Sequence, residues 1–436
     1  MYNICMDNKT QVIVVGGGPA GVSAAVTVAR AGKEVILIER GNFCGSKNVF
    51  GGAVYTKPIK EIFPDFEQSA PLERNNIKHK YMLLTENEDT TISHCSVDEN
   101  SNSYTVIRAK FDRWMAEQAK KEGVTLVTQT LVKDLIIENS KIIGVKTELE
   151  DYYADIVILA DGVNSLLARQ AGLRKDFEQS DVALGVKEVI KINNEKINER
   201  FNLKENEGCI TEIIGYPMNG MLGLGYMYTN QNAITIGLGI ALDELTEKQL
   251  KPYELLDKLK EHPSIVPLIK DGELLEYSAH LIPEGGYNKI PKLYGNGVLV
   301  VGDAAMLVNN LHWEGTNLAM ISGKFAGETA VEAIDKQDFS ENTLKIYKAK
   351  LDNSFIIKDL KSYKNLMPVM HKRRHSFTDY YIRKINAFFE MFTSVDGIVK
   401  RDKFKNFIKT IFTDRNILEL IKDGFAGIKL LWEILK

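Results

Sequence analysis

VIVVGGGPAG, residues 12–21, carries an apolar strand directly into the spacing G-x-G-x-x-G. A second apolar stretch, VILIER at 35–40, follows after a helix-length interval, and together they predict a β-α-β unit. In such a unit Gly16 permits the tight turn, and Gly18 lets backbone amides approach a pyrophosphate at the helix N-terminus. Gly21 lets the helix pack closely on the sheet.

Acidic residues end three apolar stretches that lie far apart in the chain. Glu39 ends the stretch just described and is placed to hold a ribose hydroxyl. ADIVILADGVNS at 154–165 and GNGVLVVGDAA at 295–305 are strands of the buried type that end at Asp161 and Asp303, each beside a glycine. Ligands of open α/β sheets bind at the carboxyl ends of strands. The alternative for Asp161 and Asp303 is ordinary turn chemistry, since Asp and Gly both favour turns.

The order of these three stretches resembles the FAD-binding glutathione-reductase-like superfamily, particularly its hydroxylase and geranylgeranyl-reductase-like branch. The resemblance implies that FAD is the cofactor and that Asp303 binds its ribitol chain. The residues that we expect to bind FAD are Gly16, Gly18, Gly21, Glu39, Arg40, Lys47, Asn48, Arg108, Val132, Asp161, Gly302, Asp303, Gly315, Thr316 and Asn317.

The composition is that of a cytoplasmic protein with no nucleic-acid partner. The chain has 436 residues, enough for two or three domains, and a formal net charge of −3. Its four cysteines lie too far apart for a C-x-x-C pair or a clustered metal site, which indicates a reducing compartment and no metal. Residues 1–11 carry no signal-peptide core, and no uncharged apolar run is long enough to span a bilayer.

The pattern of apolar residues divides the chain into three parts. We predict an α/β protein: a Rossmann-like FAD-binding domain with an inserted antiparallel β-rich substrate domain, and a helical C-terminal region. The predicted boundaries are 1–82, 105–175 and 291–335 for the discontinuous FAD-binding domain, 83–104 and 176–290 for the inserted domain, and 336–436 for the helical region.

A second glycine motif that opens a β-α-β unit is missing from the sequence. GMLGLG at 220–225 lies in a β-rich region and misses the spacing. We therefore expect no NAD(P)H-binding domain. This argues against relatives of the disulfide reductases, and less strongly against flavin hydroxylases, which also lack that domain.

Four segments narrow the resemblance further. GSKNVFGG at 45–52 and GDAAMLVNNLHWEGTNLAM at 302–320 look like the FixC proteins, relatives of electron-transfer-flavoprotein:quinone oxidoreductase. GYP at 215–217 and GLGYMY at 223–228 resemble the Gly-Trp-Pro and Gly-Gly-x-x-x-Tyr segments of that oxidoreductase. Tyr216 replaces the Trp, a mild change because both residues are aromatic with a polar group. The cysteine-rich cluster domain of the larger oxidoreductase is expected to be absent.

The resemblance implies electron-transferring flavoprotein α and β subunits and a ferredoxin-like iron–sulfur protein as partners, and a quinone as acceptor. Electrons would pass through the separate iron–sulfur protein or enter the flavin directly. Complexes of this kind can bifurcate electrons from NADH to ferredoxin and quinone, and this chain would then hold the quinone-side flavin. The residues expected to contact the quinone are Gly215, Tyr216, Pro217 and Tyr226.

Several polar groups are expected beside the flavin. Backbone amides at 315–317 open a helix and suit the flavin N1–C2=O edge, where negative charge appears on reduction. Lys47 adds positive charge there or is a solvated loop lysine. His312 relays a proton to a quinone oxygen or is a structural histidine. Arg108 reaches the pyrophosphate or ribitol, as the family implies, or carries surface charge on its helix.

Basic and aromatic residues alternate near the C-terminus. HKRRH at 371–375 precedes an aromatic segment at 380–392, and KRDKFKNFIKTIF follows at 400–412. Helices of this kind suit a membrane surface, where a lipid-soluble quinone is collected. The alternative is that these faces pack on the core or on a partner subunit. We expect a cytoplasmic protein with peripheral contact on the inner face of the cell membrane.

The sequence therefore predicts an FAD-dependent oxidoreductase that passes electrons from electron-transferring flavoprotein toward a quinone. The alternative enzymes are a geranylgeranyl-reductase-like prenyl reductase and an FAD hydroxylase. A protein without catalysis, similar to the GDP-dissociation inhibitors that bind prenylated proteins, is the alternative from another class. A yellow purified protein would argue against that last alternative.

Overall fold

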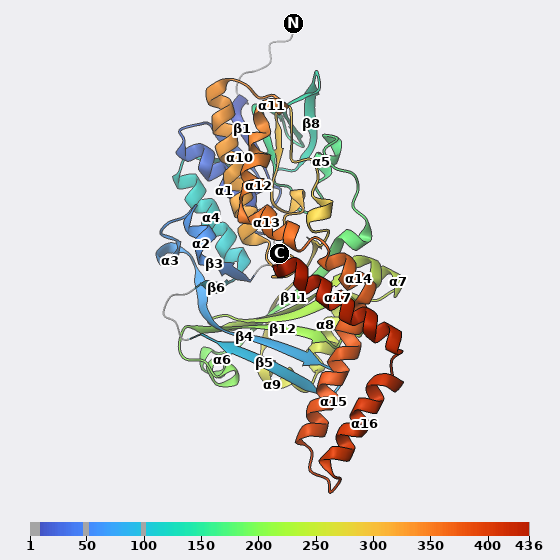
Figure 1. Cartoon of the computed structure of the whole chain (residues 1–436). Coiled ribbons are helices and arrows are strands. Elements are labelled where there is room, and N and C mark those ends of the chain that lie inside the picture. Colours follow the sequence, from blue (N-terminus) through green and yellow to red (C-terminus); the bar gives the residue numbers. More distant parts are fainter. Residues whose placement is uncertain (1–8, 47–51, 97–101, 436) are drawn as a thin grey trace. The chain divides into compact units, whose positions relative to one another are not determined.

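The computed structural model (Figure 1) describes residues 9–46, 52–96 and 102–435. Two compact units make up the chain, and both are discontinuous in sequence. The first consists of Met1–Glu73, Asn102–Val182 and His280–Lys364, and the second of Arg74–Ser101, Ala183–Ala279 and Asn365–Lys436. The three-part domain boundaries given above stay a prediction.

The first unit is built on a mostly parallel sheet. Its strands are β1 (Lys9–Val15), β2 (Val35–Ile38), β7 (Thr125–Val127), β8 (Val132–Glu138), β9 (Lys141–Thr147), β10 (Asp151–Leu159), β16 (Tyr294–Gly295) and β17 (Val298–Val300). The central order is β16-β17-β10-β1-β2-β7, and β9 and β8 extend it from β10. β10 pairs in parallel with both β1 and β17, so the carboxyl ends of the three predicted strands lie side by side. The predicted α/β class is confirmed.

Helices and short strands complete the first unit. They are β3 (Ala53–Tyr55), which pairs with β6 (Ser103–Val106), α1 (Pro19–Arg30), α2 (Thr56–Lys60), α3 (Phe66–Ser69), α4 (Arg108–Lys121), α5 (Leu166–Gln170), η2 (Gln179–Asp181), η3 (Tyr287–Lys289), η4 (Gly302–Ala305), α10 (Thr316–Lys336), α11 (Glu341–Leu344), α12 (Ile346–Asn353) and α13 (Phe355–Ser362).

Helices α1 and α10 cross very closely (Figure 1). A Cβ atom added to Gly323 of α10 would lie 2.0 Å from the carbonyl oxygen of Ala20 on α1, and one on Gly327 would lie 2.7 Å from that of Ala24. Glycine is therefore required at these two positions of α10. The close crossing fixes the N-terminus of α1 relative to α10.

The second unit contains a mixed sheet, and helices pack on one face of it. Its elements are β4 (Leu72–Leu84), β5 (Asp89–Cys95), β11 (Val182–Lys191), α6 (Asn194–Phe201), β12 (Glu207–Gly215), β13 (Gly223–Thr229), β14 (Ala233–Ala241), α7 (Leu242–Glu247), α8 (Pro252–Glu261), α9 (Val266–Ile269) and β15 (Glu273–Pro283). Their strand order is β15-β11-β14-β13-β12-β4, with β5 beside β4. The sheet is mixed because β12 runs parallel to β4, where the sequence predicted an antiparallel sheet. Side chains of α6, α7 and α8 share one buried apolar cluster with Ile213 and Met227 of the sheet.

The C-terminal part of the second unit is helical. It consists of α14 (Leu366–His375), η5 (Ser376–Tyr380), α15 (Tyr381–Thr393), α16 (Lys400–Thr413) and α17 (Ile417–Leu435). α15 and α16 pack as a hairpin through ring contacts of Phe388 with Phe404 and Phe407 (Figure 1). Among the described residues, no helix combines the length and the apolar character needed to cross a bilayer.

Candidate functional site

The glycine motif closes a turn in which side chains have no room. Gly16 has φ +106°, and a Cβ atom there would lie 2.2 Å from the carbonyl oxygen of Ala160 at the end of β10. A Cβ atom on Gly21 would lie 1.9 Å from the carbonyl oxygen of Gly16. Because only glycine fits at these two positions, the turn can lie against β10 and α1 can lie close to the sheet, as the spacing predicts.

The N-terminus of α1 is open toward an anion. Gly18 is the residue that precedes the helix, and among the described residues no side chain caps the free N–H groups of the first turn. Pro19 at the first helical position has no N–H to satisfy. Free backbone amides and the helix dipole together favour a phosphate group at this end.

Glu39 is fixed by the backbone around this turn. One carboxylate oxygen accepts a hydrogen bond from the N–H of Gly17 at 2.8 Å, and the other accepts one from the N–H of Gly41 at 2.6 Å. A carboxylate has about four acceptor positions, so each oxygen can still accept from a ribose hydroxyl. Arg40, the next residue, is exposed. The neighbouring Cys44 is buried, and its burial together with Glu39 raises the pKa of its thiol to about 12.

Arg108 lies inside the first unit, not on the surface of its helix. Its guanidinium makes a two-fold ion pair with Asp112 at 2.8 and 2.9 Å, and also donates to the hydroxyl of Thr316 at 3.3 Å. Arg108 is also the cation whose field reaches Asp303. Burial raises the pKa of Asp303 to about 6, and Arg108 partly opposes that rise. Arg108 and Asp303 therefore lie in one neighbourhood, and their roles toward a cofactor stay predictions.

The start of α10 leaves its first backbone amides without a side-chain cap among the described residues, and their place at the flavin edge stays a prediction. Gly315 precedes the helix, and no side chain caps the first turn. The side chain of Asn317 is occupied elsewhere, because its amide exchanges hydrogen bonds with the backbone N–H and carbonyl of Tyr55 at 3.1 and 2.9 Å. Asn317 thus fixes β3 with its side chain, and only its backbone is available to a cofactor. Gly302 has φ +60° and donates its N–H to the hydroxyl of Ser322.

Asp161 binds the turn that follows β10. Its carboxylate accepts from the hydroxyl of Ser165 at 3.1 Å and from the N–H of Leu167 at 3.4 Å. Burial raises its pKa, and these hydrogen bonds oppose the rise. This is the turn chemistry given above as its alternative role. Val132 is buried at the start of β8.

Three further residues were predicted to lie near the flavin: Lys47, Asn48 and His312. Lys47 and Asn48 lie outside the described residues. His312 is exposed, and its ring contacts the edge of Tyr363 with centroids 6.2 Å apart. A role in proton transfer for His312 stays a prediction.

Sequence reasoning missed two titratable groups of the first unit. His280, on β15, lies near Arg40 and Arg108, and burial together with these cations lowers its pKa. Glu284 is buried, one of its carboxylate oxygens has no hydrogen-bond partner, and burial raises its pKa to about 8. Neither residue belongs to a motif. Only the path of the chain along β15 and directly after it places His280 and Glu284 in the first unit.

The residues expected to contact a quinone lie in the second unit. Gly215 has φ +103°, and a Cβ atom there would lie 2.2 Å from the carbonyl oxygen of Leu84. A cis peptide bond joins Tyr216 to Pro217. The ring of Tyr216 lies 5.6 Å from that of His262, a buried histidine that sequence reasoning missed.

Tyr226 is another of the predicted quinone residues. It is buried on β13, and its ring stacks on Tyr228 with centroids 5.0 Å apart. Its hydroxyl extends over Gly237 of β14, because a Cβ atom on Gly237 would lie 2.4 Å from it. Gly237 therefore makes room for the tyrosine ring on this face of the sheet.

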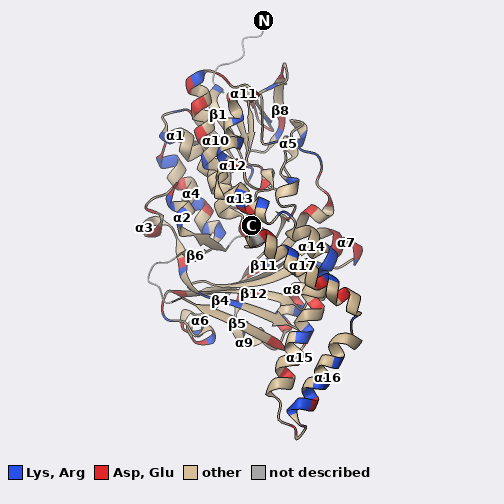
Figure 2. Cartoon of the chain, viewed as in Figure 1, with Lys and Arg blue, Asp and Glu red and all other residues tan. Residues whose placement is uncertain are grey.

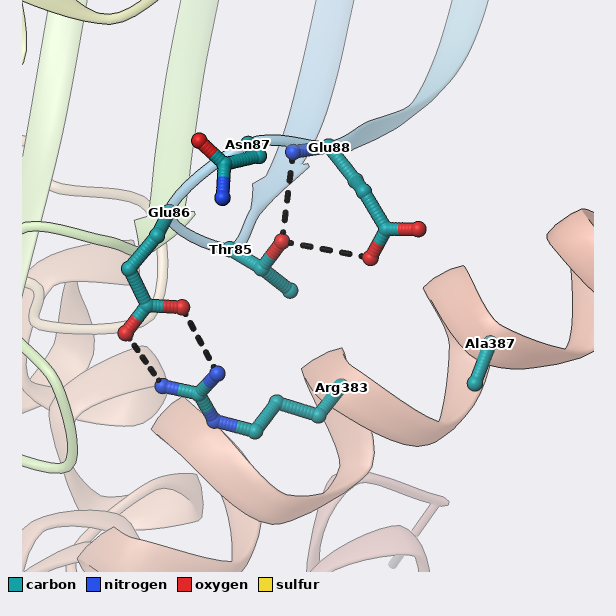
Figure 3. A pocket seen from close by; sticks show the side chains of 6 residues that line it. All are labelled: Thr85, Glu86, Asn87, Glu88, Arg383 and Ala387. Atoms are coloured by element: carbon teal, nitrogen blue, oxygen red, sulfur yellow. Dashed lines mark hydrogen bonds and ion pairs between the residues drawn. The ribbon is translucent and has the colours of Figure 1, made fainter.

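A surface hollow of about 450 Å³ lies beside the β4–β5 turn (Figure 3). None of the predicted site residues lines it. Its Arg383 and Glu86 form a two-fold ion pair at 2.7 and 2.8 Å, and the hydroxyl of Thr85 bonds Glu88. The ion pair between Arg383 and Glu86 therefore joins the β4–β5 turn to α15.

Much of the C-terminal basic charge is used within the protein. Arg373 pairs with Glu419 and Asp423, and Arg374 pairs with Glu244. Lys403 is buried and binds Asp396 and Ser394 at the turn between α15 and α16. The expectation that Arg373, Arg374 and Lys403 face a membrane is therefore wrong, since these three groups stabilise helix packing, and the expectation for the rest of residues 371–375 stays a prediction.

The remaining surface of the C-terminal helices is strongly apolar. Figure 2 shows Lys and Arg gathered on α16 and uncharged residues along much of α17. Ile421, Phe425, Ile428 and Trp432 follow one face of α17 and are 49 to 68% exposed. Val395, in the turn between α15 and α16, is 92% exposed. The face of α17 together with this turn is referred to below as the apolar C-terminal surface.

The first unit has the shape and donors that FAD requires. The turn at Gly16 has no room for a Cβ atom, and no described side chain caps the start of α1. The carboxylates of Glu39 and Asp303 follow β2 and β17, two strands of the same sheet. These features match the pyrophosphate, ribose and ribitol of the cofactor in turn. The assignment of each residue to a part of FAD stays a proposal.

Comparison with known families gives three matches along the chain. Residues 11–183 match the FAD dependent oxidoreductase family, 182–282 match "ETF-QO, ubiquinone-binding", and 366–432 match the "ETF-QO/FixC family C-terminal domain". The chain is 41% identical to Protein FixC of Bradyrhizobium diazoefficiens over 428 residues, covering 96% of this chain and 98% of the relative. It is 38% identical to Protein FixC of Escherichia coli over 427 residues, with the same coverage.

Solved structures support the fold. A geranylgeranyl bacteriochlorophyll reductase-like protein from Thermoplasma acidophilum superposes with a TM-score of 0.73 at 21% identity, covering 95% of this chain and 98% of that one. The flavin-dependent brominase Bmp2 gives a TM-score of 0.65 at 16% identity, with coverage of 93% and 100%. At these identities the likeness shows the fold alone.

Proposed function

The chain belongs to the ETF-QO/FixC family of FAD-dependent oxidoreductases, and we propose that it passes electrons from an electron-transferring flavoprotein to a quinone. The observation that carries the proposal is the unbroken likeness to FixC proteins over 96% of the chain, including the ubiquinone-binding match at 182–282. The first unit then supplies the flavin site and the second unit the quinone site.

FAD, when bound, accepts electrons singly or in pairs and passes them on. The protein's own residues decide where it lies and how its charge is balanced. In the proposed site the first turn of α1 binds the pyrophosphate, Glu39 the ribose and Asp303 the ribitol. The uncapped N-terminus of α10 offers N–H donors to the negative charge that develops on reduction.

We further propose that the protein works as one subunit of a larger, electron-bifurcating complex. Its partners are the α and β subunits of an electron-transferring flavoprotein and a ferredoxin-like iron–sulfur protein. FixC likeness supports this assignment. Three described cysteines, Cys44, Cys95 and Cys209, form no cluster, and the two buried thiols have raised pKa values, which disfavours the thiolate that a cluster needs.

The apolar C-terminal surface supports peripheral contact with the inner face of the cell membrane. Exposed aromatic and aliphatic side chains of this kind enter the headgroup region of a bilayer, and nearby lysines attract anionic lipids. Lys405 and Lys409 on α16 are exposed and form no ion pair among the described residues, so they are the candidates for that attraction.

The proposed function is tested by rapid reduction of the purified FAD-loaded protein. Reduced electron-transferring flavoprotein should reduce its flavin, and a short-chain quinone should then reoxidise it. NADH alone should reduce the flavin poorly, because the chain has one dinucleotide-binding turn. Stoichiometric reduction by NADH alone would instead favour a hydroxylase-like or reductase-like enzyme.

A further inference from the structure

One row of side chains crosses the sheet of the second unit. In strand register, Tyr81 of β4 lies opposite Glu212 of β12, and Glu212 lies opposite Tyr226 of β13. Residues paired in this way project from the same face of a sheet. Glu212 therefore lies between two tyrosines, and one of them, Tyr226, is a buried residue of the predicted quinone site.

This row lies on the face opposite the unit's own apolar cluster. The neighbours of the row in sequence, Ile213 and Met227, are buried in the cluster that contains side chains of α6, α7 and α8. Glu212 and Tyr226 are not part of that cluster. Because side chains alternate along a strand, Glu212 and Tyr226 project from the face opposite this cluster.

Access to solvent falls along the row. Tyr81 is 41% exposed, Glu212 is half-buried, and Tyr226 is 6% exposed. No hydrogen bond or ion pair of Glu212 occurs within residues 9–46, 52–96 and 102–435. Burial alone raises its pKa to about 7, since no cation lies close enough to oppose it. The carboxyl group therefore holds a proton in part of the molecules near neutral pH.

Few other titratable groups share this face. His79, one step along β4, has a pKa lowered by burial. Lys187 lies opposite Gly237 and pairs with Glu276 on β15. The hydroxyl of Tyr226 has a pKa well above its usual value, so that residue stays neutral.

Helix α15 contacts β4 and β5 on the face of the sheet that carries Glu212. Its Asn386 donates to the carbonyl of Leu83 and accepts from the hydroxyl of Thr90, which lies opposite Leu83. Of its charges near the β4–β5 turn, Arg383 is paired with Glu86. The face that carries Glu212 thus adjoins the helices proposed to contact the membrane.

We propose that Glu212 donates a proton to an oxygen of the quinone that is reduced on this face. The inference rests on the proposed function. Conversion of a quinone to a quinol takes two electrons, which reduced flavin supplies, and two protons. The O–H bond of Glu212 breaks as one quinol O–H bond forms, water supplies the second proton, and Glu212 then regains a proton from water beside Tyr81. Glu212 is thereby a catalytic residue that the sequence motifs did not reveal.

The test compares wild type with Glu212→Gln, which keeps the size of the side chain but cannot exchange a proton. Each FAD-loaded protein is reduced first, and its reoxidation by a short-chain quinone is followed from pH 6 to pH 9. The wild-type rate should fall about tenfold per pH unit above about pH 7. Glu212→Gln should be at least tenfold slower at pH 6 and nearly independent of pH. Reduction by electron-transferring flavoprotein should not change.

A second readout does not depend on turnover. The infrared difference between wild type and Glu212→Gln should contain a protonated-carboxyl C=O band that disappears as pH rises through about 7. The exposed Glu273→Gln, on β15, is the matched control and should leave both readouts unchanged. If Glu212→Gln fails to fold, Glu212→Asp should keep a slower rate that still depends on pH.

The outcomes separate the two proposals. A wild-type rate and pH profile in Glu212→Gln, or the absence of the titrating band, would overturn the role of Glu212. A wild-type protein that is reduced but never reoxidised by quinone would overturn the proposed function, whatever the infrared result.

Discussion

Replacing Gly16 by alanine tests the cofactor turn most directly. Two costs combine at this position. A φ of +106° is unfavourable for an L-residue, about 1–2 kcal/mol, and the added Cβ atom would lie 2.2 Å from the carbonyl oxygen of Ala160. Relief requires a shift of about 1 Å between β1 and β10, and strain of this kind costs about 1–3 kcal/mol. We expect Gly16→Ala to lose about 2–5 kcal/mol of stability and most of its FAD.

Gly32 provides the matched control, because it has φ +70° and nothing within 4 Å of an added Cβ atom. Gly32→Ala should show the backbone cost alone, about 1–2 kcal/mol, and retain FAD. The flavin-to-protein absorbance ratio measures loading, and urea denaturation measures stability. Equal stability losses in the two variants, with full flavin in both, would refute the steric argument and the placement of the turn.

Two further predictions concern charge. Burial raises the pKa of Glu284 from 4.5 to about 8, so the folded state holds a proton that the unfolded state releases. The protein's free energy of unfolding should therefore fall by up to about 5 kcal/mol as pH rises from about 4.5 to about 8. In urea titrations, Glu284→Gln should reduce this dependence of stability on pH. Lys405→Glu with Lys409→Glu should weaken binding to anionic liposomes, each original lysine contributing about 1 kcal/mol, with no loss of thermal stability. Lys403→Glu should instead lower the melting temperature, and unchanged liposome binding in the double variant would remove the membrane role of α16.

The arrangement of the first unit was predictable because its signals are local. An apolar strand, a glycine turn and a terminal acid each lie within a short stretch, and the parallel pairing of β1, β10 and β17 brings the three stretches together. The roles of single side chains were less predictable. Asp161 has the residue type of a ligand and the hydrogen bonds of a turn, and only the positions of Ser165 and Leu167 distinguish the two.

The C-terminal region shows why charge in a sequence is a weak guide to surface. Asp423 is 2% exposed and lies near Arg373 and Arg415, while its carboxylate also accepts from Ser376. A buried carboxylate is stable only with partners of this kind, so Asp423 determines where the side chains of Arg373 and Arg415 lie. The periodicity of apolar residues identifies the amphipathic helices, but it cannot show which cations form ion pairs inside the protein.

The difference between paired and unpaired charges also bears on the proposed role of Glu212. In the C-terminal helices the cations around Asp423 are paired, so the exposed side of α17 is left to apolar residues. On the sheet face that α15 adjoins, Glu212 has no such partner, and the row from Tyr81 to Tyr226 stays free of cations. A paired carboxylate would stay ionised and could not give up a proton at neutral pH. An unpaired, half-buried one can, and this difference in pairing separates a carboxylate that holds helices together from one suited to catalysis.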